Sequence, residues 1–364
     1  MNNNQNGLSL ISRVVITFIL MIIIIVSVIV VELYKDDRTH ISVYLNDNPQ
    51  YQSGSVDNLQ KAVTEIGKEY DAAVEFYECD NDTIWENLTR IKDKDDDYGI
   101  IIVSGIWMDE SICNVIGNCN NKAFYVEDFG GIVHSKNYKT FDFRLYQAKY
   151  LAGIIAATES KTGKILYIAD KINDKEVINA NAFILGMQSV NSELELYVAN
   201  VEDDGEAKDV LDKYIEEKNI DVLAYGIKSD IFAEYADSKG IMFIGSDKKD
   251  NISDNCLTIT WCDYKPIFED TVKIYTNGMT DIGNYKMYGI NENAVGLGML
   301  SSKVSNTSKR RIINAKVDLK KKDVFNGELY TNEGELVCGK DEKIPDETFM
   351  YGLKWYLKGV IVDE

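Results

Sequence analysis

The stretch FRLYQAKYLAGIIAATESKTGKILYIAD, residues 143–170, joins a helix pattern, a stop and a strand pattern in one short segment. Its apolar residues recur at helical spacing, at Phe143, Tyr146, Tyr150 and Ile154. One side of this helix is thin because it carries Ala152, Gly153, Ala156 and Ala157, which lets another backbone approach closely. Gly163 is typical of a left-handed helix stop before the strand ILYIA. One α/β unit therefore ends here and another begins.

Strand and helix patterns alternate on both sides of this stretch. Buried-strand patterns occur at 41–45, 73–79, 98–105, 123–128, 165–170, 194–200, 221–226, 241–247 and 256–261. Helical patterns occur between them, at 56–70, 84–91, 109–116, 177–190, 207–215, 231–238 and 266–275. The tail predicts a hairpin around Asn332–Gly334 and a last helix containing Met350, Leu353, Trp355 and Leu357. This alternation predicts parallel sheets with helices on both faces.

We therefore expect an α/β fold of two doubly wound, Rossmann-like lobes with a ligand cleft between them. The first lobe is predicted at 36–148 plus about 263–300, and the second at 149–262 plus about 301–364. A chain of 364 residues is long enough for two such lobes. Ligands bind at the carboxyl ends of the strands in open α/β sheets, and lobes of this kind close by hinge motion.

The N-terminal region, residues 1–35, is predicted to be a short tail followed by a transmembrane anchor. Residues 14–31 form an uninterrupted run of 18 residues, apolar except for Thr17 and Ser27, which is just long enough to span a bilayer. A cleaved signal peptide is the competing interpretation, but it has a shorter apolar core and a small-residue cleavage site, and neither is found here. We expect the main domain to lie outside the cytoplasm, with the anchor in the cell membrane.

The amino-acid composition excludes several classes of partner and function. The formal net charge of −20 and a pI near 4.6 argue against binding of nucleic acid or anionic lipid through the protein surface. The six cysteines include no CxxC pair, so we expect no metal, and export would permit disulfides, with Cys113 and Cys119 as the first pair to test. His40 and His134 are the two histidines, and no catalytic motif accompanies them, so we expect neither an enzyme nor a cofactor.

The candidate ligand-binding residues follow predicted strands at their carboxyl ends. Such loops carry carboxylates that accept hydrogen bonds from hydroxyl and N–H groups, and aromatic faces on which a base or sugar stacks. The alternatives are a polar turn, helix capping or packing between lobes. The candidates are Asp47, Asn48, Tyr51, Trp107, Asp128, Tyr225, Gly226, Asp247, Trp261 and Asp263.

Five segments resemble the basic membrane protein (BMP) family of solute-binding proteins, which includes purine nucleoside receptors that serve ABC importers. They are residues 146–170, the strand AFYVED, the segment VEDDGEAKDVLDKYIEEKNIDVLAYG, the strand IMFIGSD and the tail with DVFNGELYTNEGEL and MYGLKWYLKGV. They occur in the family's order over some 320 residues. The resemblance implies a type I periplasmic-binding-protein architecture, a nucleoside-like ligand and an ABC transporter permease as partner.

Several positions depart from the family's nucleoside-binding pattern. In the loop after the first strand, Asp47 keeps a carboxylate, and Tyr51 falls about where the family has its base-stacking Phe. In the second lobe, Val201 replaces the aromatic residue before the acidic turn, and the Lys after the next strand is replaced near Trp261. The stacking arrangement is therefore altered. A sensory or regulatory protein that uses the same fold to bind a ligand or a protein partner is the alternative function.

Overall fold

The computed structural model describes residues 10–33, 38–46, 54–93, 99–106, 110–117, 119, 122–127, 136–171, 173, 175–201, 204–226, 229–246, 253–278, 282, 285–350 and 352–362. The chain divides into two compact units, Met1–Thr39 and His40–Glu364. The first unit contains one described helix, α1 (Leu10–Leu33), whose described side chains are exposed. In the described part of the chain, no helix meets the length and apolarity needed to cross a membrane.

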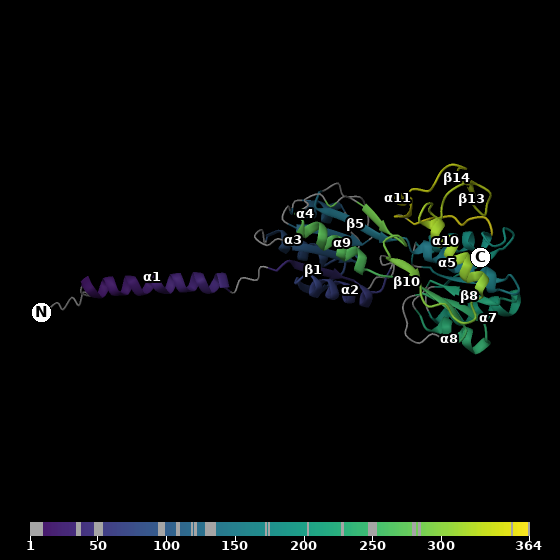
Figure 1. The fold of residues 1–364 in the computed structure, drawn as a ribbon, viewed down its shortest axis with the longest axis horizontal. Helices are drawn as coiled ribbons and strands as arrows, with labels where there is room; N and C mark the ends of the chain where they lie inside the picture. The colour runs from purple at the N-terminus through teal and green to yellow at the C-terminus, as the bar shows by residue number, and fades with distance from the viewer. Residues whose placement is uncertain are drawn as a thin grey trace. The chain divides into compact units, whose positions relative to one another are not determined.

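The second unit contains two larger sheets. The first sheet has the order β11-β5-β4-β3-β1-β2, and all its strand pairs are parallel. Its strands are β1 (His40–Leu45), β2 (Ala73–Glu78), β3 (Gly99–Ser104), β4 (Lys122–Glu127), β5 (Tyr138–Phe143) and β11 (Tyr285–Tyr288). The helices that pack on it are α2 (Val56–Glu69), α3 (Ile84–Asp93), α4 (Glu110–Gly117) and α9 (Lys265–Thr276). Separate apolar clusters cover its two faces, one with α2 and α9 and the other with α3 and α4 (Figure 1).

The second sheet has the order β12-β10-β9-β8-β6-β7-β15 and is parallel except for the pair β10 and β12. Its strands are β6 (Ile165–Asp170), β7 (Leu196–Val201), β8 (Val222–Tyr225), β9 (Met242–Ser246), β10 (Cys256–Cys262), β12 (Val295–Leu297) and β15 (Val360–Val362). One face is covered by α5 (Leu145–Glu159) and α6 (Glu176–Gln188), with α10 (Asn306–Leu319) packed on α5. The other face is covered by α7 (Asp204–Lys218) and α8 (Ile231–Lys239). The prediction of parallel sheets with helices on both faces is confirmed.

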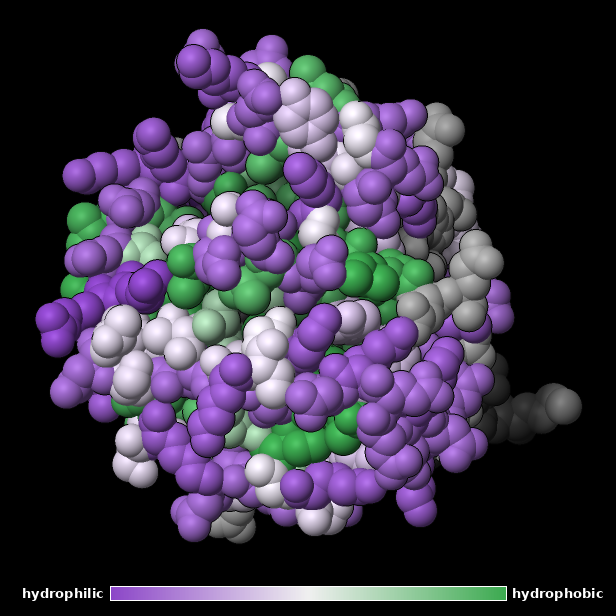
Figure 2. Space-filling view, turned by 90° about the vertical axis from the view of Figure 1, so that its right-hand side faces the viewer, coloured by the Kyte–Doolittle hydropathy of each residue, from purple (hydrophilic) through white to green (hydrophobic). Residues whose placement is uncertain are grey.

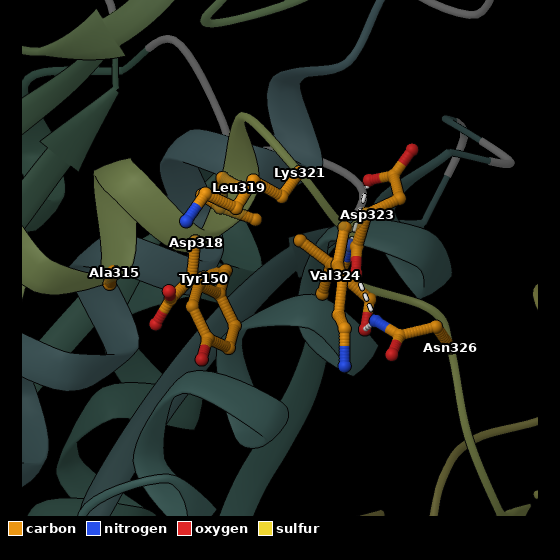
Figure 3. A pocket seen from close by; sticks show the side chains of 9 residues that line it. Tyr150, Ala315, Asp318, Leu319, Lys321, Asp323, Val324 and Asn326 are labelled. Atoms are coloured by element: carbon orange, nitrogen blue, oxygen red, sulfur yellow. Dashed lines mark hydrogen bonds between the residues drawn. The ribbon is translucent and has the colours of Figure 1, made fainter.

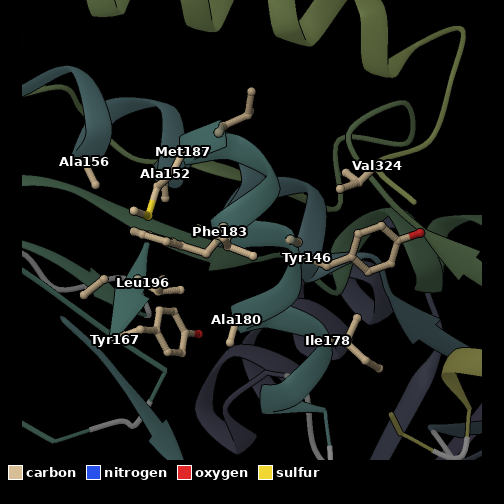
Figure 4. Close-up of a cluster of buried hydrophobic side chains, with 14 of the residues drawn as sticks. Tyr146, Ala152, Ala156, Tyr167, Ile178, Ala180, Phe183, Met187, Leu196 and Val324 are labelled. Atoms are coloured by element: carbon tan, nitrogen blue, oxygen red, sulfur yellow. The ribbon is translucent and has the colours of Figure 1, made fainter. Parts of the chain in front are cut away.

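The face of α5 that carries small residues packs closely against another helix, as the sequence predicts. Gly153 on α5 and Gly186 on α6 face each other so closely that a Cβ on Gly153 would lie 2.1 Å from the Phe183 carbonyl oxygen, and one on Gly186 would lie 2.0 Å from the Tyr150 carbonyl oxygen. Around this contact lies the largest apolar cluster of the chain (Figure 4). Because each glycine admits the backbone of the other helix, both are needed for this close packing.

The structure differs from the sequence interpretation at several elements. Phe143 is the last residue of strand β5 and does not begin the helix, which starts at Leu145. The predicted last helix is wrong: α11 (Asp346–Phe349) is short, Gly352 and Gly359 adopt positive φ, and the chain then forms β15 beside β7. Strands β5, β11, β12 and β15 and helix α10 were not predicted. The hairpin is confirmed as β13 (Leu329–Tyr330) and β14 (Leu336–Cys338).

Candidate functional site

Buried ionisable side chains gather at the carboxyl ends of strands from both sheets. Glu127 is the last residue of β4, and Asp142 is the last but one of β5. Lys149 lies in the first turns of α5, directly after β5, while Lys175 and Glu176 begin α6 after β6. This is the edge at which open α/β sheets bind ligands. We call these five residues the ionisable cluster.

Glu127 is fully buried and accepts two hydrogen bonds. Ser104, the last residue of β3, donates its hydroxyl at 2.5 Å, and Tyr264, at the start of α9, donates its phenol at 2.7 Å. Desolvation by burial raises the pKa of the Glu127 carboxyl, because the ionised form loses hydration. The two hydrogen bonds and the charge of Lys175 oppose that rise. Glu127 thus ties together β3, β4 and α9.

An ion pair joins the two sheets. Lys175 Nζ lies 2.9 Å from Asp142 Oδ2, with side-chain exposures of 12% and 2%. Asp142 belongs to the first sheet, and Lys175 is at the start of α6, which packs on the second. The charge of Lys175 also acts on Glu127. The cationic side chain at the start of α6 thus pairs with a carboxyl near the end of β5, and burial makes the pair sensitive to loss of either partner.

A second group of contacts lies on the second sheet. The carboxyl of Glu176 accepts hydrogen bonds from Tyr167 hydroxyl at 2.9 Å and from Asn179 Nδ2 at 2.8 Å. Lys149 Nζ donates to the Tyr225 carbonyl oxygen at 3.2 Å. Burial raises the pKa of Glu176 and lowers that of Lys149, while the attraction between the two charges opposes both shifts. These contacts fix the carboxyl end of β8 and the start of α6 in place.

Six of the ten predicted ligand-binding residues lie outside the described part of the chain, and they stay predictions. They are Asp47, Asn48, Tyr51, Trp107, Asp128 and Asp247. The described strands place the segments that lead to them, since Asn46 follows β1 and Glu127 and Ser246 end β4 and β9. The expected pairing of Cys113 with Cys119 also stays a prediction, because the side chain of Cys113 is outside the described residues.

Tyr225 and Gly226 lie beside the ionisable cluster. The Tyr225 ring is buried against Phe232 and Phe243, so its side chain is part of a core, and its carbonyl oxygen faces Lys149. A Cβ on Gly226 would lie 1.9 Å from Glu176 Oε2. The space that a side chain at residue 226 would fill is therefore occupied by the carboxyl of Glu176.

Trp261 and Asp263 lie where the chain returns from β10 to the first sheet. Trp261 is partly exposed, and its indole occupies the space beside Gly296 on β12, where a Cβ would lie 2.7 Å from the ring. Asp263 Oδ1 accepts from the Lys265 backbone N–H at 2.9 Å, at the start of α9. One carboxylate oxygen of Asp263 therefore helps to begin that helix.

The sequence interpretation missed the ionisable cluster. The sequence alone does not single out its members, because charged residues are mostly exposed. Two signals were present. Lys149 is the one charged residue in 145–158, a helix segment of mostly aromatic, aliphatic and small residues, and Glu127 directly follows the apolar run 123–126. If the apolar residues around Lys149 and Glu127 pack in the core, these two charged side chains must be buried with them.

Two hollows in the described structure lie away from this edge. One has a volume of about 360 Å³ between α5 and the end of α10, lined by Tyr150, Asp318, Lys321, Lys322 and Asn326 among others (Figure 3). The other, of about 550 Å³, lies beside Cys256 and Met299–Lys303. Among the described residues, no group of three or more His, Cys, Asp or Glu side chains is arranged to hold a metal ion.

The replacement Glu127→Gln is expected to change how stability depends on pH. Because the folded-state pKa of Glu127 is raised above its unfolded value near 4.5, its contribution to the free energy of unfolding is fully present below pH 4.5 and is lost as pH rises through the folded-state pKa. Glutamine does not titrate, so the decline in stability as the pH rises above 4.5 should be shallower, by at most about 1.4 kcal/mol per pH unit.

Urea titrations at several pH values measure this slope. The control is Glu86→Gln, whose wild-type carboxylate has 72% side-chain exposure. This control should leave the slope unchanged. Equal slopes for the wild type and the Glu127 variant would show that this carboxyl ionises in the folded protein as it does in the unfolded chain.

These features define a class of protein: two α/β sheets of mainly parallel strands, with carboxyl-end contacts between them, as in solute-binding proteins that close around a ligand. A family model described as ABC transporter substrate-binding protein, PnrA-like, matches residues 41–332. The chain belongs to this Bmp family, whose members are binding proteins and not enzymes. The resemblance seen in the sequence is therefore confirmed.

Individual relatives agree with this assignment. A purine-binding protein of Brucella abortus is 27% identical over 239 residues, which are 62% of this chain and 67% of that protein. A transcriptional activator of the comK gene from Bacillus halodurans has a similar structure, with a TM-score of 0.63, 18% identity and coverage of 78% of this chain and 98% of that one. A solute-binding protein of Aeropyrum pernix has a TM-score of 0.60 with 14% identity, and covers 77% and 91%. The two structures show the fold alone.

Proposed function

We propose that this protein binds a purine nucleoside or a related purine at the carboxyl ends of its two sheets and presents it to an ABC transporter permease. Membership of the substrate-binding family supports capture of a small solute, and the purine-binding relative from Brucella abortus supports the ligand class. The observation that carries the proposal is the ion pair between Lys175 and Asp142, because it places groups of both sheets in contact at this edge.

The proposed ligand contacts come from the loops that continue these strands. Asp247 follows β9 and Asp128 follows β4, and a carboxylate there accepts hydrogen bonds from ribose hydroxyls or a purine N–H. Tyr51 and Trp107 supply aromatic faces, and base–aromatic stacking contributes about 1–3 kcal/mol per base. Glu127 of the ionisable cluster directly precedes Asp128, and its hydrogen bond with Ser104 holds the end of β3, the strand that leads to Trp107. Lobe closure would bring the two sets of loops onto the ligand.

The proposed site is tested by Asp247→Ala. We expect this variant to lose detectable adenosine or guanosine binding in calorimetry while its thermal unfolding stays within a few degrees of the wild type. Asp254→Ala, an exposed aspartate in the following turn, is the matched control and should bind as the wild type does. Unchanged affinity of the Asp247 variant would place the ligand elsewhere.

We also propose that the apolar run at 14–31 anchors the protein in the cell membrane, with residues 40–364 outside the cytoplasm. The length and apolarity of the run in the sequence support this. The test is carbonate extraction of cell membranes followed by protease treatment of intact protoplasts. We expect the protein to stay in the membrane fraction and its main domain to be digested. Release into the soluble fraction, or protection from protease, would contradict the proposal.

A further inference from the structure

Helix α10 and the residues just after it carry a charge opposite to that of the rest of the protein. Residues 309–322 have seven cationic side chains and one acidic side chain, a net charge of +6 in a chain whose net charge is −20. We call the seven the basic face: they are Lys309, Arg310, Arg311, Lys316, Lys320, Lys321 and Lys322. Such clustering produces a local positive potential that the total charge hides.

The basic face points to solvent. The buried side of α10 is formed by Ser308, Ile312 and Leu319, which pack toward the core. Five of the seven cationic side chains are exposed, and Lys309 and Lys316 are half-buried. Among the described residues, none of the seven makes an ion pair with a carboxylate within 4 Å, whereas the neighbouring Asp323 is engaged by Arg144 and Tyr146. The positive charge of this face is therefore available to a partner.

Two aliphatic side chains lie within the basic face. Ile313 is 62% exposed and Val317 is 50% exposed, and they are four residues apart, so they neighbour each other on the helix surface. Arg310 and Lys316 each lie three residues from Ile313 on the helix, so they neighbour it on the helix surface, and Lys320 and Lys321 follow at the end of α10. Figure 2 views the side of the molecule formed by the second sheet, where hydrophilic residues predominate and apolar ones form small separate patches. No broad apolar surface is seen there.

We infer that the basic face of α10 docks on an anionic lipid surface. Cationic residues attract anionic head groups, each contributing about 1 kcal/mol near the surface, and exposed aliphatic side chains among them enter the boundary between head groups and acyl chains. The pair Ile313 and Val317 favours lipid over single-stranded nucleic acid, because such nucleic acid is bound by cations at its phosphates and by aromatic side chains at its bases, and no aromatic residue lies in 309–322.

The proposed anchor would strengthen this contact. Eight residues separate Val31 from His40, so an anchored apolar run would keep the folded unit within about 30 Å of the bilayer. Tethering raises the effective concentration of a weak second contact. This step rests on the proposed anchoring, whereas the docking itself does not. The expectation that the acidic protein avoids anionic lipid is thus limited to surfaces outside α10.

The test uses residues 36–364, so that the apolar run contributes nothing to binding. All four apolar clusters lie within 41–362, and the removed part therefore contains no residue of any described core. Vesicles of phosphatidylcholine with 30% phosphatidylglycerol are compared with pure phosphatidylcholine by co-sedimentation, at low and high salt. We expect binding to the anionic vesicles alone, and release on raising the salt concentration.

The test variant combines Arg310→Gln, Lys320→Gln and Lys321→Gln, and should bind anionic vesicles roughly 100-fold more weakly. The matched control removes the same charge elsewhere with Lys61→Gln, Lys68→Gln and Lys208→Gln, all exposed, and should stay within about threefold of the wild type. The pair Ile313→Ser and Val317→Ser should weaken binding roughly tenfold. Melting curves confirm that each variant folds.

Three results would overturn the lipid assignment. They are equal binding to both vesicles, an equal loss in the control variant, and no vesicle binding at all. Salt-sensitive dimerisation that the test variant abolishes, without vesicle binding, would assign the face to the acidic surface of a second copy. Purine affinity is measured on the same variants and should not change. Loss of the proposed solute function is therefore distinguishable from loss of docking.

Discussion

Replacing Gly153 by alanine should lower the free energy of unfolding by about 3 kcal/mol. The new Cβ would lie 2.1 Å from the Phe183 carbonyl oxygen and 3.2 Å from the Met187 backbone nitrogen. Both atoms belong to the backbone of α6, so relief requires α5 and α6 to move apart. That movement would open the apolar cluster that the two helices form with the second sheet. Urea unfolding followed by circular dichroism measures the loss.

Gly117→Ala is the matched control. It is also at a helical glycine, where alanine gains up to about 1 kcal/mol of helix propensity, but no atom lies within 4 Å of its new Cβ. We expect this variant to be as stable as the wild type or slightly more stable. Gly186→Ala should resemble Gly153→Ala, and the double variant should lose less than the sum, since one separation of the helices relieves both clashes. Wild-type stability in Gly153→Ala would contradict the close packing.

Lys175→Met should destabilise the arrangement of the two lobes by about 3 kcal/mol and weaken solute binding at least tenfold. The substitution leaves the carboxylate of Asp142, which is 2% exposed, without the charge at 2.9 Å that offsets its desolvation. It also takes away a charge that holds down the pKa of Glu127. Because the pair links the two sheets, its loss favours separated lobes and hence the unliganded state.

The double variant Lys175→Met with Asp142→Asn distinguishes two causes of the loss: the missing attraction between the two charges, and the cost of leaving the Asp142 carboxylate buried without a partner. Removing the carboxylate should recover most of the stability, because no buried charge is then left without its partner. Lys265→Met is the control: its ion pair with Glu69, at 3.5 Å, has side-chain exposures of 37% and 50%, and such pairs contribute less than about 1 kcal/mol. An equal loss of unfolding free energy in Lys175→Met and Lys265→Met would contradict the stabilising role of the buried ion pair.

The sequence predicted most of the fold because local periodicity carries most of it. Strand β3 and helix α5 have patterns that fit one structure, and the alternation of such elements leads to parallel sheets. The errors occur where contacts between residues distant in sequence determine the secondary structure. Strand β15 is only three residues long and forms because β7 offers an edge, while the apolar spacing of the segment before it imitates a helix. Helix α10 was missed because its outward side is charged and two of its apolar residues face solvent.

For the candidate site, the sequence predicted the edge of the sheets at which it lies, but not the buried charged residues that form it. Strand ends identify the edge of the sheet, but they do not reveal which charged side chains turn inward. Lys175 and Asp142 are 33 positions apart, one at the start of α6 and the other in β5, so no local sequence pattern predicts their contact. Glu176 and Gly226 are likewise brought together by the fold, and Gly226 is required because a carboxyl occupies the space of its side chain.

Titration of the protein with adenosine and guanosine in a calorimeter, with thermal unfolding measured in parallel, tests the central claim most directly. We expect saturable binding of at least one purine nucleoside at one site per chain. At a ligand concentration 100 times the dissociation constant, binding should add about 2.7 kcal/mol to the free energy of unfolding. We also expect that Lys175→Met weakens this binding while Lys265→Met does not. Neither heat nor a shift in melting temperature with any purine base or nucleoside would contradict the proposed function and favour a sensory or regulatory role.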